Sequence, residues 1–434
     1  MTEVVAEPSA KTPVPIKRSE RNRRRYRAER RFRLYGVAAI VLAVGALVGL
    51  FHTVISGAYS ALEQTEIALD INFDPSVIDP EGARNPGALA SADYGALIKR
   101  GLKELVPDAT GRRDRRALRK IISSGAPFEL REIVRDNPGV IGTLTTVWLP
   151  ASDDVDMAVK ETGDAASSTR GRLTDKQVAW IEMLDSDGRV EKRFNLRFFT
   201  AGDSREPELA GILGAAMGSL LTLGVCLAIA FPLGVMTAIY LEEFASRNRW
   251  ITLIEVNINN LASVPSIVFG LLGLAVLLGF LGMPRSAPLV GGIVLALMTL
   301  PTVIIAGRVA LQAVPPSIRE AAYALGASPI QTVWHHVLPL AMPGVMTGTI
   351  IGMARALGET APLLMIGMVA FIVDIPSGFT DPATVLPVQI FLWADAPERA
   401  FAERTSAAVL VLLTFLVTMN LGAVLIRRKF ETRW

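Results

Sequence analysis

Long uncharged runs alternate with charged stretches along the 434-residue chain. A helix needs about 20 apolar residues to cross a hydrocarbon core roughly 30 Å thick. Six segments meet this requirement and are predicted to span a membrane: residues 34–54, 209–241, 252–282, 287–308, 339–371 and 405–427. The composition agrees with this interpretation, because 51% of the residues are hydrophobic and only 20% are charged.

Basic residues indicate which ends of the predicted spans face the cytoplasm. The stretch KRSERNRRRYRAERRFR at 17–33 precedes the first span, and three basic residues at 427–429 follow the last one. Because cytoplasmic loops are enriched in lysine and arginine, both termini are predicted to be cytoplasmic, with residues 1–33 as a disordered basic tail. Segment 34–56 is predicted to be an uncleaved anchor, since its apolar run exceeds that of a typical signal peptide. Cleavage near residues 56–58 is the alternative.

A polar insertion, residues 57–205, separates the first two spans and is predicted to be an extracytoplasmic domain. It is long enough to bury a core of its own. The predicted elements are helices at 93–106 and 128–136, a strand at 143–149, and a hairpin of strands 178–185 and 190–199 around a Ser-Asp-Gly turn. The basic cluster at 112–120 is interpreted as a solvated helix face, with binding of phosphate or anionic lipid as the alternative.

Charge and motif content exclude several classes of function. The 44 basic and 41 acidic residues give a net charge of +3, too close to neutral for a nucleic-acid-binding chain. Cys226 is the single cysteine, which excludes a disulfide framework and a cysteine-rich metal site. The chain has no GxxxxGK[ST] phosphate loop, no GxSxG elbow and no HExxH motif. We therefore predict no enzyme and no cofactor, which leaves a channel, a secondary transporter or a subunit of a machine powered elsewhere.

Residues 317–339, SIREAAYALGASPIQTVWHHVLP, bear on this choice. Arg319, Glu320, Ala321 and Ala322 begin a short helix, and Gly326 is placed to end it. Ser328 and Pro329 then start a second helix. The unit is predicted to be cytoplasmic, and its small side chains allow a partner's groove to approach closely. An ordinary loop between two spans is the alternative.

This segment resembles the EAA loop of ABC importer permeases, which docks on the ATP-hydrolysing subunit. The resemblance rests on Glu320-Ala321-Ala322, on Gly326 and on Val337-Leu338-Pro339. The aliphatic residue usual three positions before the proline is replaced by His336. A metal site at His335 and His336 is the sharper alternative, which we do not favour because adjacent residues seldom converge on one ion.

Further stretches narrow the resemblance to the PstA family of phosphate permease subunits. They are FFTAGDSREPELAGILGAAMGSLLT at 198–222, FPLGVMTAIYLEEFA at 231–245, LASVPSIVFGLLG at 261–273, REAAYALGA at 319–327 and MARALGETAPLL at 353–364. The resemblance covers about residues 198–434. It implies an all-α membrane core (residues 206–434) of the type I, MetI-like ABC importer class, with the coupling loop at 317–339. The anchor helix and a mixed α/β extracytoplasmic insertion are added to this core.

Arg355 and Glu359 are the principal candidates for a translocation path. At 1.5 Å per residue, Arg355 lies about 22 Å along the fifth predicted span, inside the bilayer. A charge at that depth costs about 2.5–3.5 kcal/mol and normally faces the bundle interior or a water-filled path. The two residues are four apart and can pair, and the guanidinium fork fits phosphate oxygens. A structural ion pair is the alternative; the resemblance favours the path and adds Thr360 to it.

A second candidate for the path lies where polar residues interrupt the third predicted span. Ser263, Pro265 and Ser266 stand in an otherwise apolar run. Proline in a spanning helix frees a backbone carbonyl, which is tolerated where a neighbour or a cavity satisfies it. In the resembling family the element looks like part of a gate wall, and a packing kink is the alternative.

The resemblance also implies the partners and the location. A PstC-like permease subunit would form a heterodimer with this chain, two PstB-like ATPase subunits would dock under the EAA loops, and a PstS-like binding protein would deliver phosphate from the periplasm. The chain would be a multi-pass protein of the bacterial inner membrane that contacts lipid and no nucleic acid. A permease for another anion, such as sulfate or molybdate, and a sensory or scaffold subunit remain alternatives.

Overall fold

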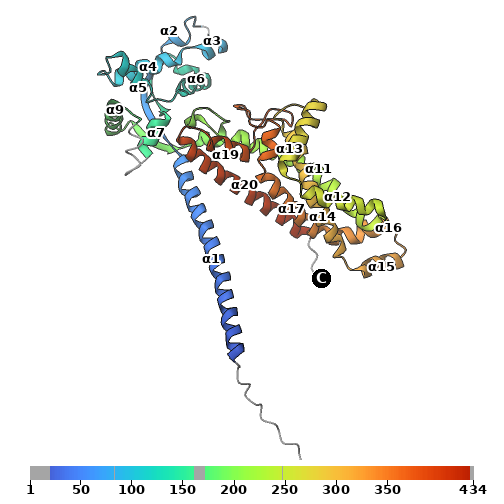
Figure 1. The fold of residues 1–434 in the computed structure, drawn as a ribbon. Helices are drawn as coiled ribbons and strands as arrows, with labels where there is room; N and C mark the ends of the chain where they lie inside the picture. The colour runs from blue at the N-terminus through green and yellow to red at the C-terminus, as the bar shows by residue number, and fades with distance from the viewer. Residues whose placement is uncertain (1–19, 83, 161–171, 247, 431–434) are drawn as a thin grey trace, which may run out of the picture. The chain divides into compact units, whose positions relative to one another are not determined.

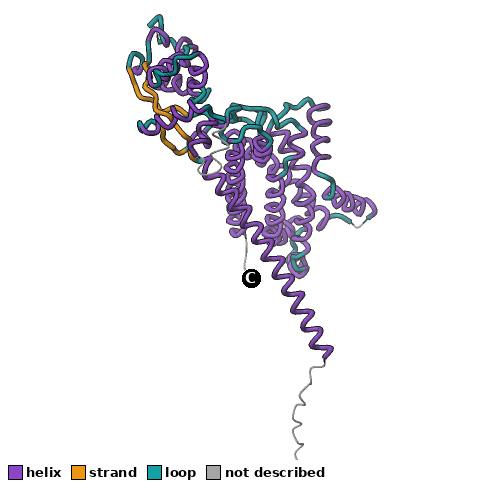
Figure 2. Tube along the Cα trace, turned by 60° about the vertical axis from the view of Figure 1, so that its left-hand side comes forward, coloured by secondary structure: helices purple, strands orange, loops and turns teal. Residues whose placement is uncertain are grey.

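The computed structural model describes residues 20–82, 84–160, 172–246 and 248–430. Residues 1–19 of the predicted tail lie outside this described part. The chain forms two compact units, residues 1–54 and 55–434, and each is described by itself. Helices make up most of both units, and the described strands belong to the second unit (Figures 1 and 2).

Helix α1, Glu20–Ala61, contains the first predicted span. Its segment Arg25–Ala61 is long and apolar enough to cross a membrane, as the span predicted at 34–54 requires. The prediction of a disordered tail is wrong for residues 20–33, because they continue the same helix. Arginine, glutamate and alanine favour helix, and the pair Glu29–Arg33, 3.1 Å apart, adds an i,i+4 contact on this stretch.

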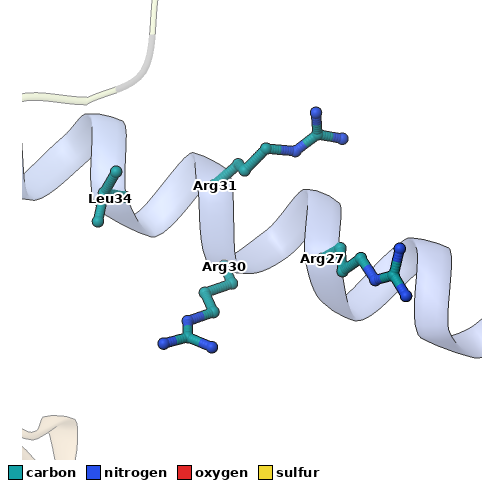
Figure 3. Close-up of a pocket in the computed structure, with 4 residues that line it drawn as sticks. All are labelled: Arg27, Arg30, Arg31 and Leu34. Atoms are coloured by element: carbon teal, nitrogen blue, oxygen red, sulfur yellow. The ribbon is translucent and has the colours of Figure 1, made fainter.

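Four residues of α1 surround the hollow drawn in Figure 3. They are Arg27, Arg30, Arg31 and Leu34, all of them exposed and all from this one helix. A hollow formed by a single helix face is a groove between long side chains. It contains none of the predicted site residues.

The inserted domain, defined here as residues 63–200, is built on an antiparallel sheet. Strand β1 (Glu63–Asn72) lies between β2 (Leu144–Pro150) and β3 (Val190–Phe194). The helices of the domain are α2 (Pro75–Ile78), α3 (Pro86–Ser91), α4 (Tyr94–Leu105), α5 (Arg112–Arg119), α6 (Ala126–Asp136), α7 (Asp153–Lys160), α9 (Asp175–Ser186) and α10 (Leu196–Thr200), with a 3-10 turn at Pro138–Val140. The domain buries its own apolar core, which includes Ile67, Leu69, Leu130 and Leu149.

Most of the predicted elements of this domain are present, but the predicted hairpin is wrong. Helices α4 and α6 and strand β2 confirm the predictions at 93–106, 128–136 and 143–149. Residues 178–185 instead belong to helix α9, whereas the strand predicted at 190–199 is present as β3 over Val190–Phe194 and gives way to α10. Thr174 and Gln177 form a capping box at the start of α9, and Trp180 and Leu184 place one apolar face in the core. The helical spacing of these apolar residues and the cap make the segment a helix, although the Ser-Asp-Gly turn after it had suggested a strand.

The rest of the second unit is a helical bundle. It comprises the 3-10 turn η2 (Pro207–Leu209), α11 (Leu213–Ile239) with the π-helical end η3 (Tyr240–Phe244), α12 (Arg249–Ala262), α13 (Ser266–Leu272) with η4 (Gly273–Phe280), α14 (Pro288–Gln312), α15 (Pro316–Ala324), α16 (Pro329–Thr332), η5 (Val333–Val337), α17 (Leu338–Gly358), α18 (Ala361–Met365), α19 (Leu386–Ala394) and α20 (Ala400–Phe430).

Small residues let the long helices of the bundle approach closely. A Cβ atom added to Gly292 of α14 would lie 2.6 Å from Cγ1 of Val225 in α11, and one added to Gly344 of α17 would lie 2.7 Å from Cβ of Ala310. Such small-residue contacts are typical of helices packed in membranes, where backbones gain van der Waals contact by close approach.

Two of the predicted spans differ from the structure. Segment 252–282 is not one straight helix, because α12 and the helix that starts at Ser266 meet at an angle of 104°. The span predicted at 339–371 ends earlier, at Gly358, and α18 follows after a break. Five described helices are long and apolar enough to cross a membrane, and the bent pair makes six if it counts as one span.

Candidate functional site

The segment after α14 forms the predicted helix–glycine–helix unit. Helix α15 ends at Ala324, and Gly326 follows with φ of +84°, a conformation that glycine adopts without steric cost. The amide of Ala327 donates to the carbonyl of Ala322 at 3.1 Å, which closes the helix end. Ser328 then caps α16 in a capping box with Gln331.

This unit, residues 316–337, exposes apolar side chains and is called the coupling segment below. Leu325 is 88% exposed, and Tyr323, Ile330 and Trp334 are also exposed. Of the predicted docking residues, Glu320 and Ala321 are exposed, whereas Ala322 is buried against the bundle. The predicted Pro339 is exposed in the first turn of α17. An exposed apolar surface of this kind favours a protein partner.

Arg319 ties the coupling segment to the bundle. Its guanidinium donates to both carboxylate oxygens of Glu243 in η3, at 2.5 and 3.1 Å, and to the carbonyls of Leu311 and Val314. The Glu243 side chain is only 9% exposed. Because a bidentate arginine–carboxylate pair fixes orientation as well as distance, this contact holds α15 in a defined orientation relative to the end of α11.

A second ionic cluster nearby was not predicted from the sequence. Arg308 of α14 lies 2.7 Å from Glu255 of α12 and 3.5 Å from Glu242 of η3, and Gln312 donates to Glu242 at 2.9 Å. The sequence does show that Glu242, Glu255 and Arg308 each stand at the end of a long uncharged run, which could have marked them as candidates for pairing. The sequence does not specify which of these charges meet, since they come from three different helices.

Arg355 and Glu359 lie together as predicted, at the end of α17 that is opposite to the coupling segment. Arg355 Nε is 3.5 Å from Glu359 Oε1, and the Arg355 side chain is 53% exposed. Glu359 is not helical, because it caps α17 with extended backbone, and Thr360 precedes α18. The pair is therefore loose and leaves most of the guanidinium fork free.

Ser263, Pro265 and Ser266 form the sharp bend between α12 and α13. The Ser263 hydroxyl donates to the carbonyl of Asn260 at 2.7 Å, and Pro265 begins the new helix because it has no N–H to continue the old one. Helix α13 then packs on α18, where a Cβ on Gly270 would lie 2.7 Å from Cα of Pro362. The structure thus brings the two predicted stretches onto neighbouring helices, although no hydrogen bond or ion pair joins them among the described residues.

His335 and His336 are both exposed at the end of the coupling segment. Within the described part of the chain, no three or more His, Cys, Asp and Glu side chains are grouped to hold a metal ion. The pair therefore gains no further ligand from the fold.

Comparison with known proteins places these features in a family. The family described as "Binding-protein-dependent transport system inner membrane component" matches residues 230–434, and a domain of unknown function (DUF3333) matches residues 19–169. The phosphate transport system permease protein PstA 1 of Mycobacterium tuberculosis (strain ATCC 25618 / H37Rv) is 38% identical over 218 residues, which cover 50% of this chain and 70% of that protein.

This chain belongs to the PstA-like family of ABC importer permeases. PstA of Yersinia pestis is 35% identical over 214 residues, covering 49% of this chain and 71% of that protein. Among solved structures, a chain of the MetNI methionine ABC transporter is 17% identical, with a TM-score of 0.39 over 50% of this chain and 95% of that chain. The protein is thus an inner-membrane component of an ABC transporter, with a MetI-like helical core and several apolar helices.

Proposed function

We propose that this chain is the permease subunit of an ATP-driven importer that moves inorganic phosphate across the inner membrane. The observation that carries the proposal is the exposed coupling segment on a core whose relatives are named phosphate transport system permeases. Hydrolysis of ATP is assigned to a separate subunit, because the chain has no phosphate-binding loop of the GxxxxGK[ST] type.

The translocation path is proposed to include Arg355, Glu359, Thr360 and the bend at 263–266. The half-exposed guanidinium can bind two phosphate oxygens. Glu359 can accept the proton that hydrogen phosphate retains and sulfate lacks, which provides a basis for selectivity. Since the Arg355–Glu359 contact is long, phosphate can replace it at small cost.

A second permease subunit is proposed to cover α12 and α13. Helix α12 buries none of its residues in this chain, and it exposes apolar side chains such as Trp250, Leu253 and Val256. In the complete importer this face would meet a PstC-like subunit, and phosphate would pass between the two. Two PstB-like ATPases would bind the coupling segments, and a PstS-like protein would deliver phosphate on the side of the inserted domain, with both termini cytoplasmic.

The proposal is tested by labelled phosphate uptake in phosphate-starved cells that lack this chain and all other phosphate systems. Re-expression should restore uptake in the presence of excess sulfate. Uptake that sulfate or molybdate competes away would assign another anion. Uptake that does not depend on the chain would contradict the proposed transport role.

A second role is favoured by the separate core of the inserted domain, which suggests a sensory or scaffold function. The amide of Asn195 donates to the carbonyl of Leu62 at 2.7 Å, so the domain leaves and rejoins the bundle at adjacent points. A short glycine linker can therefore replace residues 63–194. If uptake survives but the starvation response changes, the domain is regulatory; if uptake is lost while the core still folds, the domain belongs to the transport machinery.

A further inference from the structure

A cavity of about 580 Å³ lies between the inserted domain and the segment that leads into α11. Two carboxyl groups on its wall lack a complete set of partners. Glu208 of η2 is only 3% exposed; its Oε1 accepts from the Ser123 hydroxyl at 2.6 Å, and its Oε2 has no hydrogen-bond partner among the described residues. Asp153, the first residue of α7, likewise has a buried Oδ1 without a partner in the described part of the chain.

An ionised carboxylate is costly in such a place, because burial removes water from Glu208 Oε2 and Asp153 Oδ1 and no described donor replaces it. A neutral carboxylic acid costs much less. Burial is the main cause that raises the pKa of Asp153 to about 7. The negative charges of Asp154, Glu208 and Asp156 raise this pKa further, and the positive charge of Arg172 opposes the shift. Burial also raises the pKa of Glu208, although the hydrogen bond from Ser123 opposes it.

The other charges around the cavity do not remove this cost. The positive side chains on its wall, Lys99, Arg119 and Lys120, are exposed and therefore screened by water. Of the remaining negative side chains, Glu206 and Glu398 are exposed as well, and Asp154 is half-buried.

Arg404 of α20 is a buried cation that interacts electrostatically with both carboxyl groups. Its Nη1 is 3.5 Å from the carbonyl of Ala61 and its guanidinium lies over the ring of Phe198, so no direct ion pair with Asp153 or Glu208 is formed within the described residues.

The two carboxyl groups stand where the inserted domain is attached to the bundle. Helix α7, which Asp153 begins, ends with Lys160, whose Nζ lies 2.6 Å from Asp156 and 3.7 Å from Glu403 of α20. Asp156 also accepts from the backbone amide of Thr65 in β1 at 2.7 Å. Glu208 is five residues before the start of α11, and its carbonyl accepts from the Gln64 side chain at 3.0 Å. A charge change in the cavity therefore acts on the elements that join the domain to α11 and α20.

We propose that Asp153 and Glu208 form a proton-binding site that controls how firmly the inserted domain is held against α11 and α20. With a proton bound, the cavity wall is close to neutral and the junction is closed. Loss of the proton adds negative charge where Asp153 Oδ1 and Glu208 Oε2 are buried without a partner among the described residues, and the junction loosens. This inference goes beyond the proposed transport function and does not depend on the substrate.

The direction of the effect follows from linkage. A carboxyl group whose pKa is higher in the closed junction than in water binds protons more tightly in the closed state. The stabilisation is complete below the ordinary value for Asp153, 3.8, and is lost as the pH rises to and through about 7. Acid conditions on that side of the membrane are thus expected to close the junction.

Hydrogen–deuterium exchange on the full chain in nanodiscs tests the proposal without a transport assay. Protection of α7 and η2, corrected for intrinsic exchange, should fall by about thirtyfold between about pH 5.5 and about pH 8. The closed state loses about tenfold in stability for each pH unit between about pH 5.5 and the pKa of Asp153, about 7, an interval of about 1.5 units. Protection of α14 should stay constant and serves as the internal reference.

The isosteric variant D153N/E208Q should keep the high protection of α7 at both pH values, whereas E206Q, a matched change on the same wall, should keep the wild-type pH dependence. Wild-type protection that does not change with pH, or a double variant that retains the transition, would overturn the proposal. If the double variant loses α14 protection and so fails to fold, infrared difference spectra decide instead. A protonated-carboxyl band should titrate near pH 7 in the wild type and be smaller in D153N, where Glu129, whose pKa burial also raises to about 7, is left to titrate there. A band of equal size in the two proteins would also overturn the proposal.

Discussion

At the residue scale, the notable feature is a charged pair, Arg355 and Glu359, at the end of the otherwise apolar helix α17. Arg355 stands in the last turn of α17, where the negative end of the helix dipole stabilises a cation. Its contact with Glu359 is long and half-exposed. A surface ion pair of this kind contributes little to stability, which is consistent with the proposed role of Arg355 in binding phosphate.

Replacing Arg355 should therefore impair transport more than folding. R355K and R355Q should lower phosphate uptake by at least about tenfold to a hundredfold, since a lost charge-assisted hydrogen bond costs about 1.5–3 kcal/mol. Lysine should not restore activity, because it lacks the planar fork. R285Q, a change at an exposed arginine in the loop before α14, is the control. Normal uptake by both Arg355 variants would remove Arg355 from the path.

Gly270 is a position where a single methyl group should matter. A Cβ there would lie 2.7 Å from Cα of Pro362 and 2.9 Å from Cβ of Met365, so α13 and α18 would have to separate. G270A should lower the thermal stability of the purified chain by about 1–3 kcal/mol. Gly224 of α11 has no atom within 4 Å of its Cβ position, and G224A should be neutral or slightly stabilising. Equal melting of G270A and wild type would show that the two helices do not pack this way.

At the scale of elements, the coupling segment is held by ion pairs rather than by apolar burial alone. Its outer face exposes Leu325 and Trp334, whereas Arg319 holds it to Glu243 at the end of α11. The short helices α15 and α16 are too brief to be stable alone. Their position therefore depends on these contacts and on the caps at Gly326 and Ser328.

Breaking the Arg319–Glu243 pair should uncouple the segment from the bundle. R319Q leaves the Glu243 carboxylate nearly buried without its partner and should cost about 2–3 kcal/mol locally. We expect uptake to fall while ATP hydrolysis by the assembled transporter loses its dependence on substrate. The charge swap R319E/E243R should restore part of both, and S317A on the same helix should change neither. Wild-type coupling in R319Q would assign force transmission to other contacts.

At the scale of the whole molecule, a buried polar junction joins the inserted domain to the bundle. The side chains of Lys160 and Asp156 are each only 5% exposed, and Glu403 accepts from Ser60 at 2.7 Å on the other side of Lys160. Such a network is costly to assemble, but removing one member costs more, because it leaves a buried charge without compensation.

The variant K160M should thus destabilise the chain by about 3–5 kcal/mol. Addition of D156N should recover part of the loss, since the neutral side chain needs no cation. K103M, at an exposed lysine of α4, should stay within about 0.5 kcal/mol of wild type. Thermal unfolding of the three variants in one detergent is the measurement. A K160M chain as stable as wild type would mean that the junction does not rest on this pair.

The sequence by itself determined what local patterns encode. Charge-free runs identified the spans that became α1, α11, α14 and α20, and Gly326 with Ser328 and Pro329 identified the two short helices of the coupling segment. These features depend on hydrophobic length and on cap chemistry, which act within a few residues. The Arg355–Glu359 contact is of the same kind, since its members are only four residues apart.

The tertiary structure alone decided the features that depend on distant partners. Pro265 marked a break, but its angle of 104° follows from the packing of α13 on α18 through Gly270. Strand β1 was not predicted, because it is defined by its two neighbouring strands, and the Glu208 cavity needs residues from both sides of the junction. The sequence pattern shows which residues are apolar enough to be buried and which are charged and need a partner. Which residues contact one another depends on the tertiary fold, because the partners are distant in sequence.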